Sequence, residues 1–311
     1  MSILITGGGG FLGQRLARAL LSREANASLT LLDIAFPADV DSRCRCVTGD
    51  LGSAEALGRA LEPGTTSIFH LAAVVSGAAE ADFDLGYRVN LDGTRALLEA
   101  CRRLAQPPRL VFASSVAAFG GAMPEMLDDS TTPRPQSSYG VQKVAGEYLV
   151  GDYSRKGFID GRSMRLPTIV IRPGKPNLAA SSFASGILRE PLNGVPAACP
   201  VPDSTGLWIL SPRRVTESLL HGHDLPAEAW GTNRVLNLPG ITVSVRDMIG
   251  ALRKIAGDEV AARIEFKPDA RIQAIVNGWP ARFRTERAAK MGFLADEGIE
   301  PIIRDYLDEL S

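Results

Sequence analysis

The sequence predicts an α/β protein with a doubly wound parallel sheet and a smaller C-terminal lobe. Over the first half of the chain, short apolar runs typical of strands alternate with segments that carry apolar residues at helical spacing. Such alternation specifies a parallel sheet that is covered by helices on both faces. After residue 160 the pattern changes, and a region rich in Pro, Gly and Ser extends from Pro173 to Pro212. We therefore expect one domain over residues 1–165 and a second lobe over residues 166–311.

The expected strands and helices follow one another in chain order. Strands are expected at residues 2–6, 29–33, 44–48, 66–70, 109–113 and 166–171, and helices at residues 11–22, 53–62, 86–104 and 137–155. The last of these strands is expected to return to the same sheet. Residues 244–256 and 296–310 are amphipathic and are expected to be helices of the second lobe. Between Pro173 and Pro212 we expect loops that build a binding site.

A glycine-rich turn separates the first strand from the first helix. Gly7, Gly10 and Gly13 give the spacing G-x-x-G-x-x-G, and starting from Gly8 the same turn reads G-x-G-x-x-G, so the spacing leaves two kinds of dinucleotide-binding turn open. Positions without a Cβ let backbone N–H groups approach a diphosphate at the helix N-terminus, where free donors and the dipole favour anions. This context predicts a dinucleotide-binding Rossmann domain over residues 1–165, with residues 166–311 mainly a substrate-binding lobe. A turn without a ligand is the alternative.

Asp33 ends the second expected strand, twenty residues after Gly13. A carboxylate there accepts hydrogen bonds from both hydroxyls of an adenosine ribose. It would also repel a 2′-phosphate, because a like-charge pair about 5 Å apart costs roughly 3 kcal/mol at an effective dielectric near 20. The sequence therefore predicts NAD as the cofactor in preference to NADP. An aspartate that only caps the turn is the alternative.

Composition argues against several kinds of partner. The 34 Lys+Arg and 35 Asp+Glu residues nearly cancel and no basic run stands out, so we expect neither nucleic acid nor a membrane surface as a partner. No apolar run has membrane-spanning length and no charged-then-apolar leader precedes the first strand, so a cytoplasmic location is expected.

The cysteines and histidines do not indicate a metal site. The four cysteines include no C-x-x-C pair, and Cys44 and Cys46, which would face one side of a strand, are expected to be reduced packing residues. His221 and His223 lie beside Asp224, where a loop with solvated polar groups is expected. We therefore expect no metal.

Tyr139 and Lys143 lie four residues apart in an expected helix. That spacing places both side chains on one helix face, with about 6 Å of axial rise between them. A free phenol has a pKa near 10, and a neighbouring ammonium can lower it by about one to three units. The same ammonium can bind the ribose of a nicotinamide. The pair predicts acid–base chemistry at a nicotinamide cofactor, although Y-x-x-x-K pairs also occur on solvated helix faces.

Together with Tyr139 and Lys143, the glycine turn resembles the extended short-chain dehydrogenases/reductases, also called the NAD-dependent epimerase/dehydratase family. This group includes nucleotide-sugar epimerases and dehydratases. Four further segments agree with the group in chain order: Gly49-Asp50-Leu51, His70-Leu71-Ala72-Ala73, Val89-Asn90-Leu91-Asp92-Gly93-Thr94, and the run from Phe112 to Gly120 in which Phe119 replaces a Tyr. The resemblance covers nearly the whole chain.

The resemblance implies roles for individual residues. Ser115, Tyr139 and Lys143 would be catalytic, with Ser115 binding the reacting oxygen. The cofactor would be held by Gly7, Gly10, Phe11, Leu12, Gly13, Asp33, Asp50, Leu51, Leu71, Ala72, Ala73, Ser76, Asn90, Tyr139, Lys143 and Pro167. In this group the helices corresponding to residues 86–104 and 137–155 commonly pair between two copies, which implies a homodimer.

The substrate side departs from the epimerases of the group. Thr168 stands where they usually carry the Asn of R-x-x-N, and Arg213 and Arg214 replace the two acids of their V-D-D-V-type segment. This change favours an anionic substrate, although a solvated loop is equally natural for the two arginines. The run from Arg165 to Phe183 resembles the D-erythronate dehydrogenases of the group, which oxidise the 2-hydroxyl of a four-carbon sugar acid with NAD. The candidate substrate residues are Ser76, Ser115, Thr168, Lys175, Asn177 and Arg213, with Lys175 or Arg213 at the carboxylate.

These observations lead to three hypotheses. The first is an NAD-dependent dehydrogenase of a small 2-hydroxy sugar acid, in which Tyr139 takes the hydroxyl proton while Lys143 lowers the Tyr139 pKa and fixes the cofactor ribose. The second is a nucleoside-diphosphate-sugar epimerase or dehydratase that retains its NAD. The third is a non-catalytic NAD-binding regulator, against which the joint presence of Ser115, Tyr139 and Lys143 argues.

Overall fold

The computed structural model describes residues 1–24, 26–174 and 179–310. They form two compact units. Unit 1 comprises Met1–Ser115, Ser138–Arg165 and Thr216–Leu236, and unit 2 comprises Val116–Ser137, Leu166–Val215 and Asn237–Ser311. The chain passes between the units several times, so neither unit is one continuous segment. The predicted division of function between residues 1–165 and 166–311 stays a prediction.

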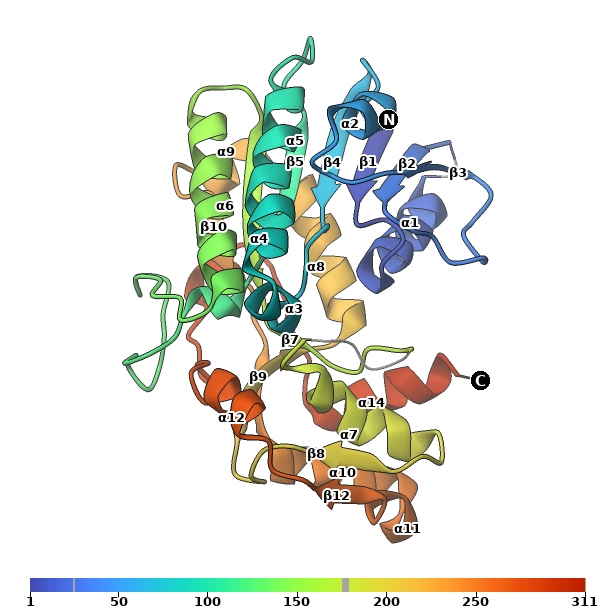
Figure 1. Cartoon of the computed structure of the whole chain (residues 1–311), viewed down its shortest axis with the longest axis vertical. Coiled ribbons are helices and arrows are strands. Elements are labelled where there is room, and N and C mark those ends of the chain that lie inside the picture. The colour runs from blue at the N-terminus through green and yellow to red at the C-terminus, as the bar shows by residue number, and fades with distance from the viewer. Residues whose placement is uncertain (25, 175–178, 311) are drawn as a thin grey trace. The chain divides into compact units, whose positions relative to one another are not determined.

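Unit 1 is built on a seven-stranded sheet (Figure 1). The strand order is β10-β6-β5-β4-β1-β2-β3. The strands are β1 Ser2–Thr6, β2 Ser28–Asp33, β3 Cys44–Thr48, β4 Thr65–His70, β5 Arg109–Ser115, β6 Asp160–Leu166 and β10 Val235–Asn237. The neighbouring strands from β3 through β2, β1 and β4 to β5 pair in parallel. An order of 3-2-1-4-5-6 is that of the Rossmann fold, so the predicted fold class is confirmed.

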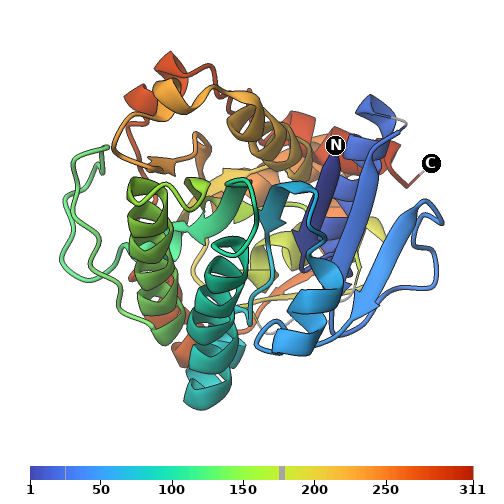
Figure 2. The ribbon, with the colours of Figure 1, turned by 90° about the horizontal axis from the view of Figure 1, so that it is seen from above.

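The helices of unit 1 follow the strands as the alternating pattern predicted. They are α1 Phe11–Arg23, α2 Ala54–Ala60, α3 Ser76–Ala81, α4 Phe83–Gly86, α5 Gly93–Cys101, α6 Ser138–Arg155, the later part of α8 Pro212–Asp224, and α9 Ala227–Trp230. A π-helical segment, Tyr87–Asp92, interrupts the helix expected over 86–104. Helices α5 and α6 lie side by side (Figure 2), where the Tyr153 hydroxyl donates to Glu99.

The strand predicted over 166–171 is wrong in position. The sixth strand of the central sheet is β6, and Thr168–Ile169 form β7 in a three-stranded sheet of order β11-β9-β7. Pro167, which cannot donate to a strand ladder, separates the two strands. The error arose because β6, with the sequence DGRSMRL, is polar but buried. Its buried arginines donate hydrogen bonds to protein groups instead of to solvent, Arg162 through Nη1 and Arg165 through Nε.

The region from Pro173 to Pro212 was predicted to consist of loops, and this is also wrong. It contains α7 Ser182–Leu192, β8 Ala197–Cys199 and β9 Gly206–Leu210. Gly186 and Pro191 lower the intrinsic helix propensity of α7. Burial of Phe183, Ile187 and Leu188 in the core of unit 2 outweighs that cost.

His221 and His223 lie in helix α8 instead of the predicted loop. His223 is buried, and its ring stacks on Phe69 with 5.1 Å between centroids. Its Nε2 lies 2.9 Å from Ser67 Oγ and its Nδ1 lies 2.9 Å from Asp224 Oδ1. Burial lowers the pKa of His223. His223 therefore packs against the central sheet. Helix α8 begins at Pro212, because the first position of a helix tolerates proline.

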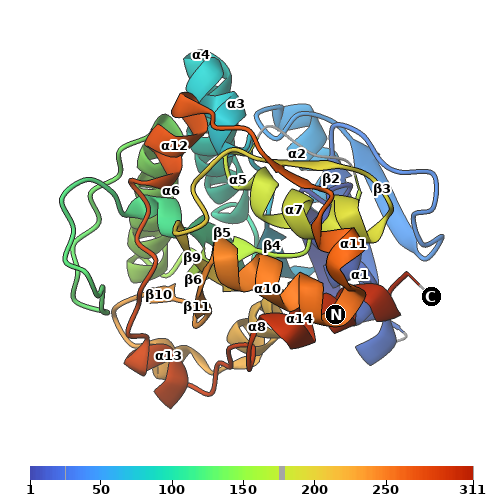
Figure 3. The same ribbon diagram turned by 90° about the horizontal axis from the view of Figure 1, so that it is seen from below.

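Unit 2 has its own core, and its helices are labelled in Figure 3. Besides α7, β7, β8 and β9 it contains β11 Ile241–Ser244, α10 Val245–Ala256, α11 Asp258–Ala261, β12 Ile264–Phe266, α12 Ala270–Val276, α13 Glu286–Lys290 and α14 Ile299–Asp308. Helix α10 packs against α7 and α14. The amphipathic segments predicted at 244–256 and 296–310 thus form α10 and α14, and the Ser244–Asp247 capping box fixes the start of α10.

All four cysteines are free thiols. Cys101 and Cys199 are buried in the cores of units 1 and 2, as expected of packing residues. Cys44 is half-buried and Cys46 is exposed, so the packing role predicted for Cys46 is wrong, because β3 is an edge strand of the sheet. Across the described residues, no helix is both long enough and apolar enough to span a membrane.

Candidate active site

The glycine turn brings the ends of β1, β4 and α1 into close contact. Gly7 has φ +72°, and a Cβ on it would lie 2.7 Å from the backbone nitrogen of Ala72. A Cβ on Gly13 would lie 2.2 Å from the carbonyl oxygen of Gly7. Side chains at these positions are therefore excluded. Gly7, not Gly8, has the left-handed conformation, which favours the register Gly7, Gly10, Gly13 of the two that the spacing left open.

The N-terminus of α1 suits a bound anion. Gly10 is the N-cap, no side chain caps the helix, and its first turn carries no acidic residue. The first N–H groups of a helix have no partner within it, so Phe11 and Leu12 present donors and the positive end of the dipole. These features fit the diphosphate of a dinucleotide, and this cofactor-binding role stays a prediction.

Asp33 lies at the C-terminal end of β2 beside the same turn. Its Oδ2 accepts a hydrogen bond from Gly9 N–H at 2.9 Å, and its Oδ1 accepts from Ile34 N–H at 2.7 Å. Asp33 therefore caps the turn, which was the alternative to a ribose-binding role. Each carboxylate oxygen can still accept further hydrogen bonds, so capping and ribose binding are compatible.

Asp50 and Leu51 follow β3. The Asp50 carboxylate accepts a hydrogen bond from Gly52 N–H at 2.8 Å, which fixes the turn, and Leu51 is buried in the core of unit 1. Leu51 also packs against Gly93, where a Cβ would lie 3.0 Å from the leucine side chain. The cofactor-binding role of both residues stays a prediction.

A chain of hydrogen bonds fixes the loop after β4. Thr6 Oγ1 lies 2.7 Å from His70 Nδ1, and His70 Nε2 lies 2.8 Å from Thr94 Oγ1, which in turn donates to Asn90 O at 2.7 Å. Since the Thr94 hydroxyl donates to that carbonyl, His70 must donate through Nε2 and accept at Nδ1. Burial and the Lys143 ammonium lower the pKa of His70 to about 3, so the ring is neutral. Ala72 N–H also donates to Thr6, at 3.4 Å.

Asn90 joins this loop to helix α6. Its amide accepts from Val74 N–H at 2.7 Å, and it donates to Val74 O at 3.0 Å and to Gln142 Oε1 at 2.7 Å. Asn90 is buried and lies in the π-helical segment. Such segments often occur at functional sites. These hydrogen bonds fix Asn90 between the loop after β4 and helix α6, and its cofactor-binding role stays a prediction. Gln142 is a partner that the sequence did not reveal.

Tyr139 and Lys143 occupy one face of α6, as their spacing predicted. Lys143 is buried and donates from Nζ to Ala113 O at 2.8 Å. The same nitrogen lies 5.5 Å from the centroid of the Tyr139 ring and 4.9 Å from that of Phe112. Burial lowers the pKa of Lys143 to about 8, against an opposing effect of Glu147. An ammonium beside a phenol favours the phenolate. Ser115 is the last residue of β5 and is half-buried.

A buried ionic cluster adjoins Lys143. Arg165 donates from Nε to Glu147 Oε1 at 2.8 Å and from Nη2 to Glu147 Oε2 at 2.7 Å. The Ser114 hydroxyl donates to the same carboxylate. Glu147 was missed as a site residue, although its position four residues after Lys143 on one helix was the available signal.

The other predicted substrate residues belong to both units. Ser76 begins α3 in unit 1, while Thr168 is buried in β7 of unit 2, directly after Pro167. Arg213 Nε donates to Asp305 Oδ2 at 2.8 Å within unit 2, so its charge is partly neutralised there. Lys175 and Asn177 lie outside the described residues. The substrate roles of all these residues stay predictions.

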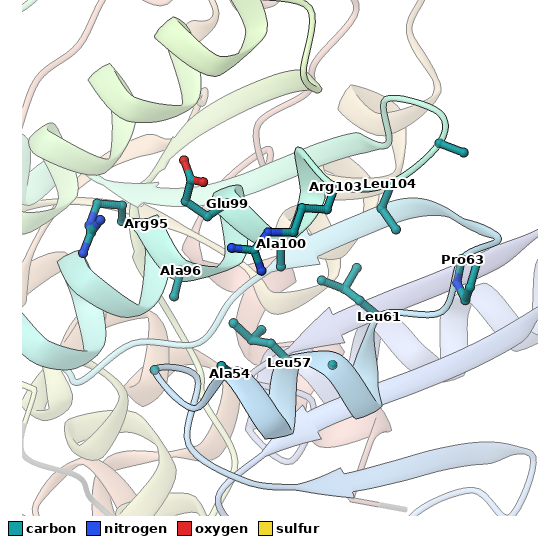
Figure 4. Close-up of a pocket in the computed structure, with 13 residues that line it drawn as sticks. Ala54, Leu57, Leu61, Pro63, Arg95, Ala96, Glu99, Ala100, Arg103 and Leu104 are labelled. Atoms are coloured by element: carbon teal, nitrogen blue, oxygen red, sulfur yellow. The ribbon is translucent and has the colours of Figure 1, made fainter.

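A groove on unit 1 lies apart from this site (Figure 4). It measures about 570 Å³ and lies between α2 and α5. Its lining includes Leu57, Leu61 and Ala96, with Arg95 and Glu99 on the α5 side. None of the predicted catalytic or cofactor residues is part of this lining.

The fold and the glycine turn define a dinucleotide-binding α/β protein, and the Tyr139–Lys143 pair indicates oxidoreductase-type chemistry. The chain belongs to the NAD dependent epimerase/dehydratase family, whose model matches residues 3–201. The predicted family and its cofactor NAD are thereby confirmed.

Three relatives are similar over nearly the whole chain. The D-erythronate dehydrogenase of Cupriavidus necator is 54% identical and is matched over 99% of this chain and 98% of its own. The D-erythronate dehydrogenase of Haemophilus influenzae is 44% identical over 99% of both chains. The crystal structure of the nucleoside-diphosphate-sugar epimerase from Agrobacterium tumefaciens has a TM-score of 0.92 and 42% identity, covering 99% of this chain and 94% of that one.

Proposed function

We propose that this protein is an NAD-dependent dehydrogenase that oxidises the 2-hydroxyl of D-erythronate to 2-dehydro-D-erythronate. The observation that carries the proposal is the 54% identity to a D-erythronate dehydrogenase across nearly the full length of both chains. The second such enzyme, at 44% identity, supports the same activity. The geometry of α6 supports it chemically, because a buried ammonium lies beside the tyrosine ring.

In this proposal each residue has a defined task. Tyr139, as a phenolate, takes the proton of the substrate 2-hydroxyl, and the Ser115 hydroxyl binds the same oxygen. Lys143 stabilises the phenolate. The first turn of α1 binds the cofactor diphosphate, and Asp33 binds the adenosine ribose. When bound, NAD accepts the hydride from C2, so the alcohol loses a hydride and a proton and becomes a ketone.

A nucleoside-diphosphate-sugar epimerase is the second candidate. The 42% identity to the structure of such an enzyme from Agrobacterium tumefaciens favours it. Identity is higher to the dehydrogenases, and Thr168 replaces the Asn with which the epimerases of the group help bind their substrate. The two activities differ in cofactor use, because a dehydrogenase releases NADH at every turnover whereas an epimerase regenerates NAD in place.

The deciding experiment measures NADH formation with a panel of three- to six-carbon aldonates, and in parallel the conversion of UDP-glucose to UDP-galactose. We expect D-erythronate to be oxidised, the purified protein to contain little NAD, and UDP-sugars neither to react nor to compete. Interconversion of UDP-sugars without oxidation of any aldonate would establish the epimerase instead.

The assembly and location belong to the same proposal. We infer a homodimer that pairs α5 and α6 of two copies, because Tyr148 and Val141 on α6 are 70% and 40% exposed. Light scattering of the purified protein tests this, and a monomeric mass at micromolar concentration would refute it. A cytoplasmic location follows from the proposed chemistry, which draws on the NAD pool of the cell.

A further inference from the structure

The cluster of Ser114, Glu147 and Arg165 is buried, with side chains from three elements that meet beneath Lys143. Glu147 is on α6, Arg165 on β6 and Ser114 on β5, and each is less than a tenth exposed. Arg165 makes two hydrogen bonds to the Glu147 carboxylate, at 2.8 and 2.7 Å, and Ser114 makes another. A buried carboxylate with this many partners has a fixed position.

Lys143 lies one helical turn before Glu147, about 6 Å along the axis. Gly146 lets α6 approach β5 at this turn, because a Cβ there would lie 2.7 Å from the Phe112 ring. The Lys143 ammonium is thereby held over that ring and bonded to Ala113 O. The cluster thus acts on an ammonium that is removed from water.

The ionisable groups around Lys143 come from several elements. His70 on β4 is neutral, Tyr139 and Glu147 belong to α6, and Arg165 acts from β6 through its pair with Glu147. On neighbouring helices, Glu80 of α3 accepts from Ser138 N–H and Glu99 of α5 accepts from Tyr153, towards the two ends of α6. Glu147 is therefore the carboxylate that acts on Lys143 from its own helix.

We propose that the Glu147–Arg165 pair, held by Ser114, is a positioning site that keeps the Lys143 ammonium charged and in place beside Tyr139. The effect on catalysis rests on the proposed function, whereas the effect of the pair on the Lys143 ammonium does not depend on which reaction the protein catalyses. Glu147, one helical turn from Lys143, favours the charged ammonium, and Arg165 limits this effect by balancing part of the Glu147 charge. Glu147 and Arg165 contact neither substrate nor cofactor in this proposal and act through Lys143.

Substitution of Glu147 and substitution of Arg165 should shift the Lys143 pKa in opposite directions. Glu147→Gln leaves the Arg165 charge unbalanced, which should lower the Lys143 pKa by about one unit. Arg165→Met leaves the Glu147 charge unbalanced, which should raise the Lys143 pKa by a similar amount. The double variant restores neutrality and should return the pKa towards that of the parent. A merely structural role would give shifts of one sign, and the double variant would be the most disturbed.

The test that does not depend on activity is an NMR titration of protein labelled with 13C at lysine Cε. The chain has six lysines, so the Lys143 signal can be assigned by its loss in Lys143→Arg. Asp152→Asn is the matched control, because it removes an exposed carboxylate from the same helix. We expect no shift in the control and opposite shifts in the two single variants. An unchanged Lys143 titration in a folded Glu147→Gln or Arg165→Met protein overturns the inference, and either variant suffices if the other does not fold.

The second readout is the pH profile of erythronate oxidation. Loss of the ammonium limits the rate at high pH, so the upper limb should move down by about one unit in Glu147→Gln and up in Arg165→Met. If the parent enzyme does not oxidise erythronate, the proposed function fails while the NMR titration still decides the inference. If the parent is active and the limbs of the variants coincide with that of the parent, the inference fails alone.

Discussion

Asp33 allows the cofactor preference to be tested by one substitution. Its carboxylate accepts hydrogen bonds from Gly9 and Ile34 N–H groups at 2.9 and 2.7 Å, so it lies at the edge of the glycine turn. In Asp33→Ala these two donors lose their acceptor, and a carboxylate that would oppose a 2′-phosphate is removed. We expect NAD to be used less well and NADP better.

The magnitude follows from the two effects. Loss of charge-assisted hydrogen bonds to the ribose costs about 1.5–3 kcal/mol, which lowers kcat/KM for NAD roughly ten- to a hundredfold. Relief of repulsion contributes about 3 kcal/mol to NADP, or roughly a hundredfold. The freed Gly9 N–H adds a donor for a phosphate. The ratio of kcat/KM for NAD to that for NADP should therefore fall roughly a thousand- to ten-thousandfold.

The assay is the ratio of kcat/KM for the two cofactors at fixed substrate. Asp33→Asn should give a smaller loss of NAD use, because its amide oxygen can still accept from one of the two backbone donors. Asp39→Ala is the control. Asp39 is exposed and follows β2, and its carboxylate lies 3.4 Å from the Arg18 guanidinium. An Asp33→Ala ratio equal to that of the parent, in a folded protein, refutes the placement of Asp33 at the ribose.

Three further predictions concern the turn, the catalytic pair and the buried histidine. Gly13→Ala should destabilise unit 1 by about 1–3 kcal/mol and lower the affinity for NAD, because the added Cβ would lie 2.2 Å from the Gly7 carbonyl oxygen. Urea unfolding measures the stability and calorimetric titration the NAD affinity, and a stability and affinity equal to those of the parent would contradict this packing. Tyr139→Phe should lower turnover about 10²–10⁴-fold with NAD affinity nearly intact, whereas Lys143→Ala should damage both; equal binding losses in calorimetry would remove this distinction. In the folded state His70 is neutral, with a pKa of about 3, whereas a histidine in the unfolded chain has a pKa near 6.5. Between these values the unfolded state binds one more proton, so the free energy of unfolding decreases as pH falls from about 6.5 towards 3. His70→Gln should flatten that dependence in urea midpoints at pH 7 and pH 5, and an undiminished slope would assign it to other groups.

The parts of the site that could be predicted from sequence are those encoded by local spacing. Gly7 and Gly13 bracket a strand–turn–helix junction, and Tyr139 and Lys143 share a face because a helix has 3.6 residues per turn. The polarity of β6 misled the prediction, because a buried strand is expected to be apolar. Helix α7 was missed because Gly186 and Pro191 argue locally against the helix that tertiary burial stabilises. The Glu147–Arg165 pair joins two elements, and no local spacing encodes that contact.

The polar strand β6 shows why such contacts matter. Arg162 and Arg165 are three residues apart, so they point to opposite faces of the sheet. Arg162 Nη1 donates to the carbonyl of Gly222 at 2.6 Å and also to that of His223, at the C-terminal end of α8, where a cation is favoured by the helix dipole. Arg165 donates to Glu147 on α6. One buried strand thus contacts a helix on each face through a charged side chain, in addition to apolar packing such as that of Val150 against Gly161. On one face, Arg162 stabilises the C-terminal end of α8. On the other face, Arg165 binds the Glu147 carboxylate, one helical turn from Lys143. The free-energy cost of burying each guanidinium group is thereby offset by hydrogen bonds to carbonyl groups for Arg162 and to a carboxylate for Arg165.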